Sequence, residues 1–140
     1  KEKFLIAKVL KIISQKIKYP NHIICGFAKI RNFENPASKN IPKVVMNKNN
    51  ELVYISRALV PSSKKKSKIQ FYKQVCIYAF NKMELAKFSS MKKKSALEKL
   101  EDIEILRFFD LGIKIKMVKL SSKTLAVDVK SDIKKVEKFL

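Results

Sequence analysis

The sequence predicts an α/β domain in which helices and apolar strands alternate around a mixed or mostly parallel sheet. Two observations lead to this fold class. Short continuous apolar runs such as HIICGFAKI and KQVCIYAFN are typical of buried strands, and longer runs with apolar residues at every third or fourth position are typical of helices. Because 140 residues can bury a sizeable core, we expect residues 1–140 to be one domain or part of one.

The first half of the chain predicts a helix, a strand and a hairpin. Residues 4–17 have apolar side chains at helical spacing, and the pair Tyr19-Pro20 ends that helix. Residues 22–30 follow as a buried strand. The stretch KVVMNKNNELVYIS contains two β-rich runs around Asn47–Asn50, which is the pattern of a hairpin. A long polar segment, typical of functional or mobile loops, extends from Arg57 to Tyr72.

The second half begins with another buried strand, residues 73–81, and a short helix around residues 83–88. The stretch SALEKLEDIEILRFFDLG, residues 95–112, predicts one continuous helix that ends at Gly112. Its apolar stripe is formed by Leu97, Leu100, Ile103, Leu106 and Phe109.

Apolar and basic residues alternate in residues 113–120, which favours a half-exposed strand. The last segment predicts a strand that ends at Val127 and a helix over residues 132–140.

A formal net charge of +20 raises the hypothesis of a nucleic-acid-binding module. Two features argue against it. Only three of the 32 basic residues are arginines, and the lysine clusters SSKKKSK and SMKKKS contain no aromatic side chains on which bases could stack. We therefore interpret the charge as a solvated lysine surface and keep nucleic-acid binding as an alternative.

Other classes of protein are excluded by what the sequence lacks. It has no apolar run of membrane-spanning length and no signal-peptide pattern, so we expect a cytoplasmic protein. Cys25 and Cys76 lie in apolar runs without metal-ligand spacing and are expected to be buried thiols. His22 is the only histidine, which disfavours histidine-based catalysis. Because the chain begins with Lys1 rather than Met, we expect a processed product or a fragment.

The acidic residues are few and unevenly placed. Glu98, Glu101 and Glu104 recur every three residues in the predicted long helix and would share a solvated face, with Glu104 pairing with Arg107. Asp128 stands alone at the end of a predicted strand. It is either a turn-forming residue or a ligand for a hard cation such as Mg²⁺, because ligands in α/β proteins bind at the carboxyl ends of strands.

Two further residues permit two interpretations each. Arg57 opens the long polar loop, and its planar guanidinium can hold a carboxylate or phosphate with two hydrogen bonds. A surface ion pair of little energetic value is the alternative. Tyr78 is either a core residue or, if its strand borders a cleft, a hydroxyl that faces a polar substrate.

Four stretches resemble successive blocks of the 3-deoxy-manno-octulosonate (Kdo) cytidylyltransferases, or CMP-Kdo synthetases. They are VVMNKNNELVYISRALVPSSK, KQVCIYAFNKMEL, LEKLEDIEILRFFDLGIKIKMV and AVDVKSDIKKVE, in the family's order and at similar spacing. The resemblance implies a Rossmann-like nucleotidyltransferase fold and a homodimer. It also implies a reaction in which CTP and a 3-deoxy-2-keto sugar acid give the CMP-sugar and pyrophosphate with Mg²⁺, for lipopolysaccharide or surface-polysaccharide synthesis.

The resemblance assigns roles to six residues. Asp128 matches a metal-binding aspartate, which would explain the lone carboxylate at a strand end. The matches to sugar-binding positions are Arg57, Lys64, Gln74, Tyr78 and Glu104. Gln74 stands where a histidine is common in the family, and Ile105 where a glutamine is common. Within the range of Kdo and its relatives, these two departures favour a modified Kdo or a related acid over Kdo itself as the sugar.

One part of the family pattern has no counterpart here. The glycine-containing loop that grips CTP and the acidic block that follows it are missing, and Glu2 is the nearest candidate for that second metal ligand. We therefore expect the carboxy-terminal, sugar-binding and dimerising part of such an enzyme, inactive by itself. An acylneuraminate or other nonulosonate cytidylyltransferase is the nearest enzymatic alternative.

Overall fold

Residues 2–65 and 67–121 are described by a computed structural model and form nine regular elements. The predicted strand up to Val127 and the predicted helix over residues 132–140 lie outside the described residues. The helices are α1 (Glu2–Lys18), α2 (Lys82–Ser90), α3 (Ala96–Glu101) and α4 (Ile105–Asp110). The strands are β1 (Ile23–Lys29), β2 (Lys43–Met46), β3 (Leu52–Ser56), β4 (Tyr72–Ala79) and β5 (Ile115–Lys119).

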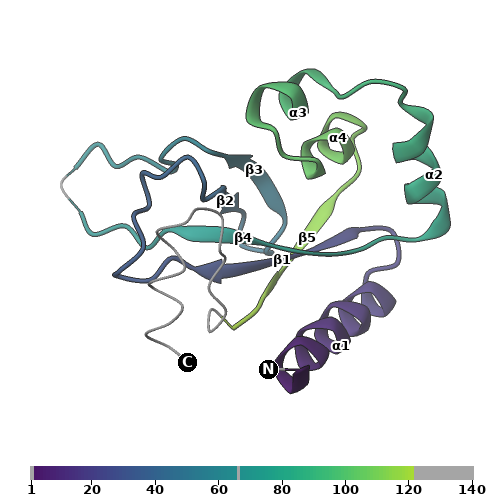
Figure 1. Ribbon diagram of the computed structural model, residues 1–140, viewed down its shortest axis with the longest axis horizontal. Helices are drawn as coiled ribbons and strands as arrows, with labels where there is room; N and C mark the ends of the chain where they lie inside the picture. The colour runs from purple at the N-terminus through teal and green to yellow at the C-terminus, as the bar shows by residue number, and fades with distance from the viewer. Residues whose placement is uncertain (1, 66, 122–140) are drawn as a thin grey trace.

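The five strands form one mixed sheet in the order β3-β2-β4-β1-β5 (Figure 1). β1 runs parallel to β5, whereas the pairs β1–β4, β2–β3 and β2–β4 are antiparallel. The mixed sheet is therefore confirmed, but its described part is mostly antiparallel rather than mostly parallel. Loops join β1 to β2 and β3 to β4. Between β4 and β5 the chain passes through α2, α3 and α4, and β5 then lies parallel to β1.

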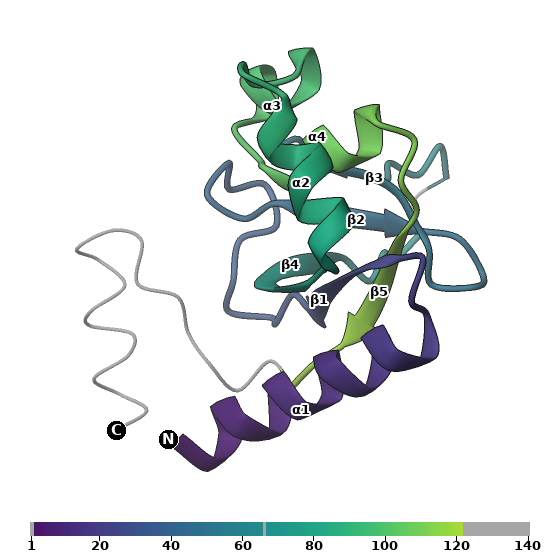
Figure 2. The ribbon, with the colours of Figure 1, turned by 90° about the vertical axis from the view of Figure 1, so that its right-hand side faces the viewer.

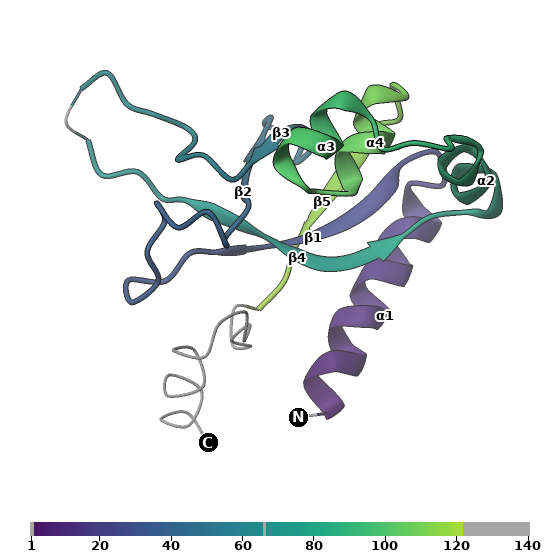
Figure 3. The same ribbon diagram turned by 45° about the horizontal axis from the view of Figure 1, so that its top comes forward.

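Helices lie on both faces of this sheet. α2, α3 and α4 cover one face, and α1 crosses the opposite face (Figures 2 and 3). Side chains alternate along β1, so the sheet has a core on each side. Ile23 and Phe27 belong to the larger core together with Leu106, and Ile24 belongs to the smaller core together with Ile12 of α1. β5 is more buried than the half-exposed strand that we expected, because it contributes to both cores.

The long helix predicted over residues 95–112 is two short helices. α3 ends at Glu101, and Asp102 has a left-handed backbone with φ of 52° before α4 begins. Arg57, directly after β3, binds the chain at this break, where its guanidinium donates hydrogen bonds to the carbonyl oxygens of Glu101 (2.5 Å) and Asp102 (2.9 Å). A side chain from a distant loop thus binds the carbonyls at the end of α3. Gly112, with φ of 68°, follows α4 as predicted.

The break in the helix also changes what its acidic residues do. Glu98 is 1% exposed and forms a two-pronged ion pair with Arg107, with nitrogen–oxygen distances of 2.6 and 2.7 Å. The Arg107 guanidinium stacks over the Phe88 ring of α2 at 3.9 Å. Glu98, Glu101 and Glu104 therefore do not share a solvated face, and the predicted pair of Glu104 with Arg107 is wrong. Leu100, expected in the apolar stripe, is 82% exposed.

A buried lysine holds the root of the long loop over residues 57–71. Lys43 is fully buried, and its ammonium donates hydrogen bonds to the carbonyl oxygens of Ser38 (2.8 Å) and Arg57 (2.6 Å). Burial lowers the pKa of Lys43, and the nearby carboxylate of Glu101 partly opposes that shift. The lysine thereby ties the loop before β2 to the end of β3.

We predict that the Glu98–Arg107 pair is a main support of the α3–α4 region. Glu98→Ala leaves the Arg107 charge in a largely buried place without its partner, which is expected to lower the free energy of unfolding by about 3 kcal/mol. Lys94→Ala, which breaks the exposed pair with Asp102, is the matched control and should leave stability nearly unchanged. Urea denaturation followed by circular dichroism measures both. Equal effects of the two substitutions would contradict this role.

Candidate functional site

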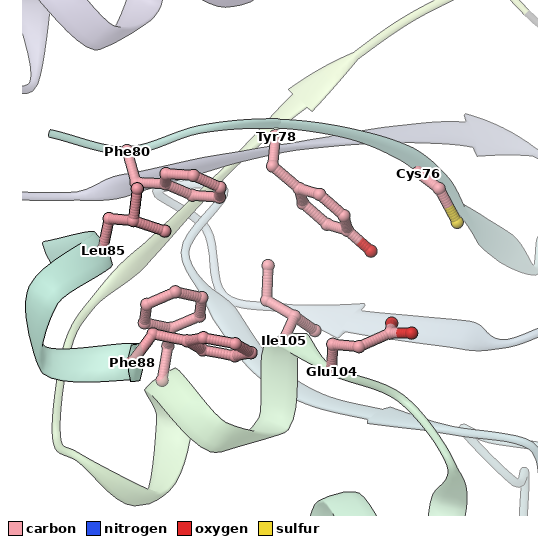
Figure 4. A pocket seen from close by; sticks show the side chains of 8 residues that line it. Cys76, Tyr78, Phe80, Leu85, Phe88, Glu104 and Ile105 are labelled. Atoms are coloured by element: carbon pink, nitrogen blue, oxygen red, sulfur yellow. The ribbon is translucent and has the colours of Figure 1, made fainter. Parts of the chain in front are cut away.

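A pocket of about 320 Å³ lies between β4 and the two helices α2 and α4 (Figure 4). β4 contributes side chains from one face, the chain from Phe80 onward lines one end, and the first turn of α4 lines the opposite wall. The lining residues are Cys76, Tyr78, Phe80, Leu85, Phe88, Glu104, Ile105 and Phe108.

The polar and apolar groups of the pocket are separated in space. The Tyr78 hydroxyl, the Glu104 carboxylate and the Cys76 sulfur lie toward one end, whereas Phe80, Leu85 and Phe88 lie at the other (Figure 4). A ligand with hydrogen-bonding groups at one end and carbon–hydrogen surface at the other would match this arrangement.

Tyr78 is held by a neighbour on its own strand. The Gln74 side-chain amide donates a hydrogen bond of 2.6 Å to the Tyr78 hydroxyl, and Gln74 is itself buried. Burial raises the pKa of Tyr78 far above its ordinary value, and the nearby thiols and the Glu104 carboxylate act in the same direction. The phenol therefore stays neutral and keeps a proton that it can donate to a ligand.

Glu104 lies at the exposed rim of the pocket, where α4 begins. Its carboxylate makes no cap hydrogen bond to the helix, and Arg107 is engaged by Glu98 instead. It can therefore accept hydrogen bonds from a ligand. The next residue, Ile105, is 2% exposed and places an apolar side chain between Tyr78 and Glu104 (Figure 4).

The structure thus brings together three of the five residues predicted to bind a sugar, with Tyr78 and Glu104 in the pocket and Gln74 behind Tyr78. Arg57 and Lys64 are not among the lining residues. The three guanidinium nitrogens of Arg57 each donate to a backbone carbonyl, those of Lys39, Glu101 and Asp102. Lys64 is exposed in the long loop.

Asp128, the predicted metal ligand, lies outside the described residues. Within residues 2–65 and 67–121, no group of three or more histidine, cysteine, aspartate or glutamate side chains could hold a metal ion. The same part of the chain contains no helix with the length and apolar character needed to cross a bilayer.

Sequence reasoning missed the apolar wall of the pocket and misplaced one thiol. Phe80, Phe88 and Phe108 look like ordinary core residues in the sequence, and no spacing distinguishes them. Cys25 is buried as predicted, but Cys76 is exposed, which corrects the expectation of two buried thiols. Cys76 lines the pocket at the end that carries the Tyr78 hydroxyl (Figure 4).

The chain matches the family model described as Cytidylyltransferase over residues 2–115, and it belongs to that family. This confirms the resemblance found in the sequence. Similar curated proteins carry the name 3-deoxy-manno-octulosonate cytidylyltransferase. That of Christiangramia forsetii is 31% identical over 140 residues, which cover 99% of this chain and 56% of the relative. That of Parabacteroides distasonis is 36% identical over 107 residues, 72% of this chain and 42% of the relative.

The fold is also similar to a solved structure, that of CMP:2-keto-3-deoxy-manno-octonic acid synthetase complexed with CTP. The TM-score is 0.82 at 25% identity, and the match covers 95% of this chain and 55% of the solved one. The Rossmann-like fold predicted from the resemblance is therefore confirmed. The chain spans about half the length of the relatives that it matches.

The two thiols should differ sharply in reactivity. Burial raises the pKa of the Cys25 thiol well above its usual range, so it stays protonated and covered, whereas Cys76 is exposed at the pocket. We predict that Ellman's reagent modifies one thiol per native chain quickly and the second only after unfolding. Cys76→Ser should remove the fast reaction and Cys25→Ser should keep it. Two fast thiols in the native chain would contradict the described burial of Cys25.

Proposed function

We propose that this chain supplies the sugar-binding part of a cytidylyltransferase that couples CTP to Kdo or a related 3-deoxy-2-keto sugar acid. The products are the CMP-sugar, used for lipopolysaccharide or surface polysaccharide, and pyrophosphate. The observation that carries the proposal is the pocket in which Tyr78 and Glu104 meet, in a chain of the cytidylyltransferase family.

The pocket suits the sugar acid in this reaction. Glu104 would accept hydrogen bonds from sugar hydroxyls, and the neutral Tyr78, oriented by Gln74, would donate one. The aromatic wall would pack against the carbon–hydrogen face of the sugar and exclude water. The anomeric hydroxyl, held in place, would then attack the α-phosphorus of CTP, so that one phosphorus–oxygen bond forms as the bond to pyrophosphate breaks.

Within the proposal, the full enzyme is a cytoplasmic homodimer that uses Mg²⁺, with Asp128 as a carboxylate ligand. A bound magnesium ion supplies positive charge that stabilises the departing pyrophosphate. Asp128 lies outside the described residues, so no step of the chemistry is assigned to these residues through the metal.

The chain by itself is proposed not to transfer cytidylate, because neither glycine lies in a loop that leads into a helix, the usual place of a phosphate-binding loop. Gly26 lies in the middle of β1, where an added Cβ would come within 2.5 Å of the Leu120 side chain and 3.0 Å of the Val75 carbonyl. Gly112 lies in the turn after α4. Gly26 and Gly112 are the only glycines in the sequence.

The identity of the sugar is the finer part of the proposal. Ile105 cannot donate or accept a hydrogen bond, and the far end of the pocket is aromatic. These side chains favour Kdo or a less hydroxylated relative of it over more polar acids. A nonulosonate remains the alternative substrate, and comparison of the two acids as ligands separates them.

We predict that Glu104→Gln weakens binding of Kdo to this chain at least tenfold, because a charge-assisted hydrogen bond to a sugar hydroxyl is worth more than a neutral one. Isothermal titration calorimetry measures the dissociation constant. Asp110→Asn, at the other end of α4 and outside the pocket, is the matched control and should bind as the unchanged chain does. Equal affinity of the Glu104 variant would remove this residue from the site.

A second prediction concerns catalysis and Asp128. We join this chain to the part of the Christiangramia forsetii relative that lies outside the match and measure pyrophosphate release from CTP, Kdo and Mg²⁺. Asp128→Asn is expected to lower turnover at least a hundredfold with an unchanged melting temperature, whereas the control Asp132→Asn is expected to keep activity. Near-normal turnover of the Asp128 variant would contradict metal binding by this residue and leave the alternative role, formation of a turn. An inactive unmodified fusion would count against the proposed function.

A further inference from the structure

The first turn of α2 is held by a lysine from the helix on the other face of the sheet. Lys16, in the last turn of α1, binds the carboxylate of Glu84, in the first turn of α2, with nitrogen–oxygen distances of 2.8 and 2.7 Å. The contact is possible because α2 and the carboxyl-terminal end of α1 lie at the same end of the sheet (Figures 1 and 3).

The ammonium group of Lys16 is fully engaged at this place. Besides the Glu84 oxygens, it donates hydrogen bonds to the carbonyl oxygens of Pro20 (3.0 Å) and His22 (2.7 Å), in the link between α1 and β1. The Lys16 side chain is 15% exposed and that of Glu84 is 8% exposed. Because solvent screens such a pair weakly, the loss of one partner leaves the other charge buried alone. The contact therefore has a defined geometry, unlike an exposed ion pair.

Glu84 also caps α2. Its carboxylate accepts a hydrogen bond of 2.7 Å from the Asn81 amide, and the Asn81 side chain accepts one of 2.8 Å from the Glu84 amide, which is a reciprocal capping box. The Asn81 side-chain amide donates to the Pro20 carbonyl, to which Lys16 also donates. One carboxylate thus joins the start of α2 to the link that follows α1.

The apolar wall of the pocket is carried by this helix. Leu85 and Phe88 line the pocket, and Leu85 directly follows Glu84. All nine residues of α2 are described, and among them only Glu84 is buried. Near the other end of α2, the Phe88 ring packs against Phe108 at 4.9 Å and against the Arg107 guanidinium at 3.9 Å. A shift of the first turn would therefore move Leu85 in particular, because Phe88 has anchors of its own.

We propose that Lys16 is a positioning residue of the sugar site, which acts through Glu84 on the apolar wall of the pocket. Lys16 is not a lining residue and belongs to the helix on the opposite face of the sheet. By fixing the first turn of α2, it holds Leu85 where the carbon–hydrogen surface of a sugar would pack, and this preorganisation favours binding. The inference rests on the proposed function, in which the pocket receives a 3-deoxy-2-keto sugar acid.

Two variants separate the position of α2 from the stability of the chain. Lys16→Met leaves the Glu84 carboxylate buried without its cation, so this variant is expected to melt at a lower temperature. The double variant Lys16→Met and Glu84→Gln has no unpaired charge there, and glutamine can keep the capping box. Its melting temperature is expected to return towards that of the unchanged chain, although α1 and α2 are no longer joined.

The affinity for Kdo, measured by isothermal titration calorimetry, is the first readout. We expect both variants to bind Kdo about fivefold more weakly or worse, because part of the binding free energy then goes into ordering α2. Lys18→Met, which changes an exposed lysine in the same last turn of α1, is the matched control and should bind as the unchanged chain does. A double variant that binds Kdo as tightly as the unchanged chain would overturn the proposal.

Steady-state kinetics of the fusion with the Christiangramia forsetii part provide the second readout. The double variant is expected to raise the KM for Kdo and to leave kcat nearly unchanged, since the contacts that it weakens act on the bound sugar before and during the reaction alike. A lower kcat with an unchanged KM would contradict a role in positioning the sugar site.

Hydrogen exchange of the α2 amides, read by NMR, does not depend on the sugar. These amides are expected to exchange at least about tenfold faster in the double variant than in the unchanged chain, with the β1 amides unaffected. If the unchanged chain did not bind Kdo, the proposed function would fail, and faster exchange would still support positioning of α2 by Lys16. Equal exchange of the α2 amides in both proteins would overturn the proposal whether or not Kdo binds.

Discussion

The contact between Arg57 and the end of α3 determines the shape of the candidate site. The hairpin side chain donates to the carbonyls of Glu101 and Asp102, and the Glu101 carboxylate accepts hydrogen bonds from the Arg57 amide and the Ser56 hydroxyl. Burial alone would raise the pKa of Glu101, but these donors and the Tyr54 hydroxyl outweigh it, and the pKa is lowered. The carboxylate therefore stays ionised while it joins β3 to α3.

The positions of α3 and α4 on the pocket side of the sheet depend on this contact between β3 and α3. Because α3 stops at Glu101, the chain turns through Asp102 and starts α4 with Glu104 at the pocket rim. The ion pair between Glu98 and Arg107 then fixes α4 against α3, and the stacking of Arg107 on Phe88 fixes both against α2. The site is thus held by charged groups that are themselves outside the pocket.

On the opposite face of the sheet, the covering helix α1 buries a lysine and exposes large apolar side chains. α1 buries Lys8 beside Ile12, whereas Ile6, Ile13 and Ile17 are exposed. Lys8 is buried, and Lys16 reaches across to the Glu84 carboxylate at the start of α2, with which it forms a largely buried ion pair. The ion pair of Lys16 with Glu84 and the burial of Ile12 hold α1 against the rest of the molecule, while apolar side chains on its outer side stay exposed.

The parts of the fold that could be predicted are those encoded locally. Continuous apolar runs identified β1 and β4, and the four polar residues 47–50 identified the hairpin. The break within residues 95–112 could not be predicted, because the arginine that binds the carbonyls at the break is 45 residues away in the sequence. The antiparallel pairing of β1 with β4 depends on how the loops bring the strands together, which residue spacing does not encode.

The candidate site was only partly visible in the sequence. Tyr78, Gln74 and Glu104 were identified through resemblance to a family, since periodicity alone favoured a core tyrosine and a solvated glutamate. The aromatic residues opposite them carry no signal that distinguishes a pocket wall from a core. Arg57 was recognised as unusual, but its observed partners are backbone carbonyls.

The position of β1 in the sheet has a consequence for how the chain acquires its structure. β1 lies near the start of the sequence, whereas its two neighbours in the sheet lie much later, β4 at residues 72–79 and β5 at residues 115–119. Most of its contacts are therefore distant in sequence, and a topology of high contact order folds slowly because long loops must close before the pairing stabilises them. During synthesis on the ribosome, the face of β1 that carries Ile23 and Phe27 stays uncovered until Leu106 and β5 have emerged, because these are the parts that cover it.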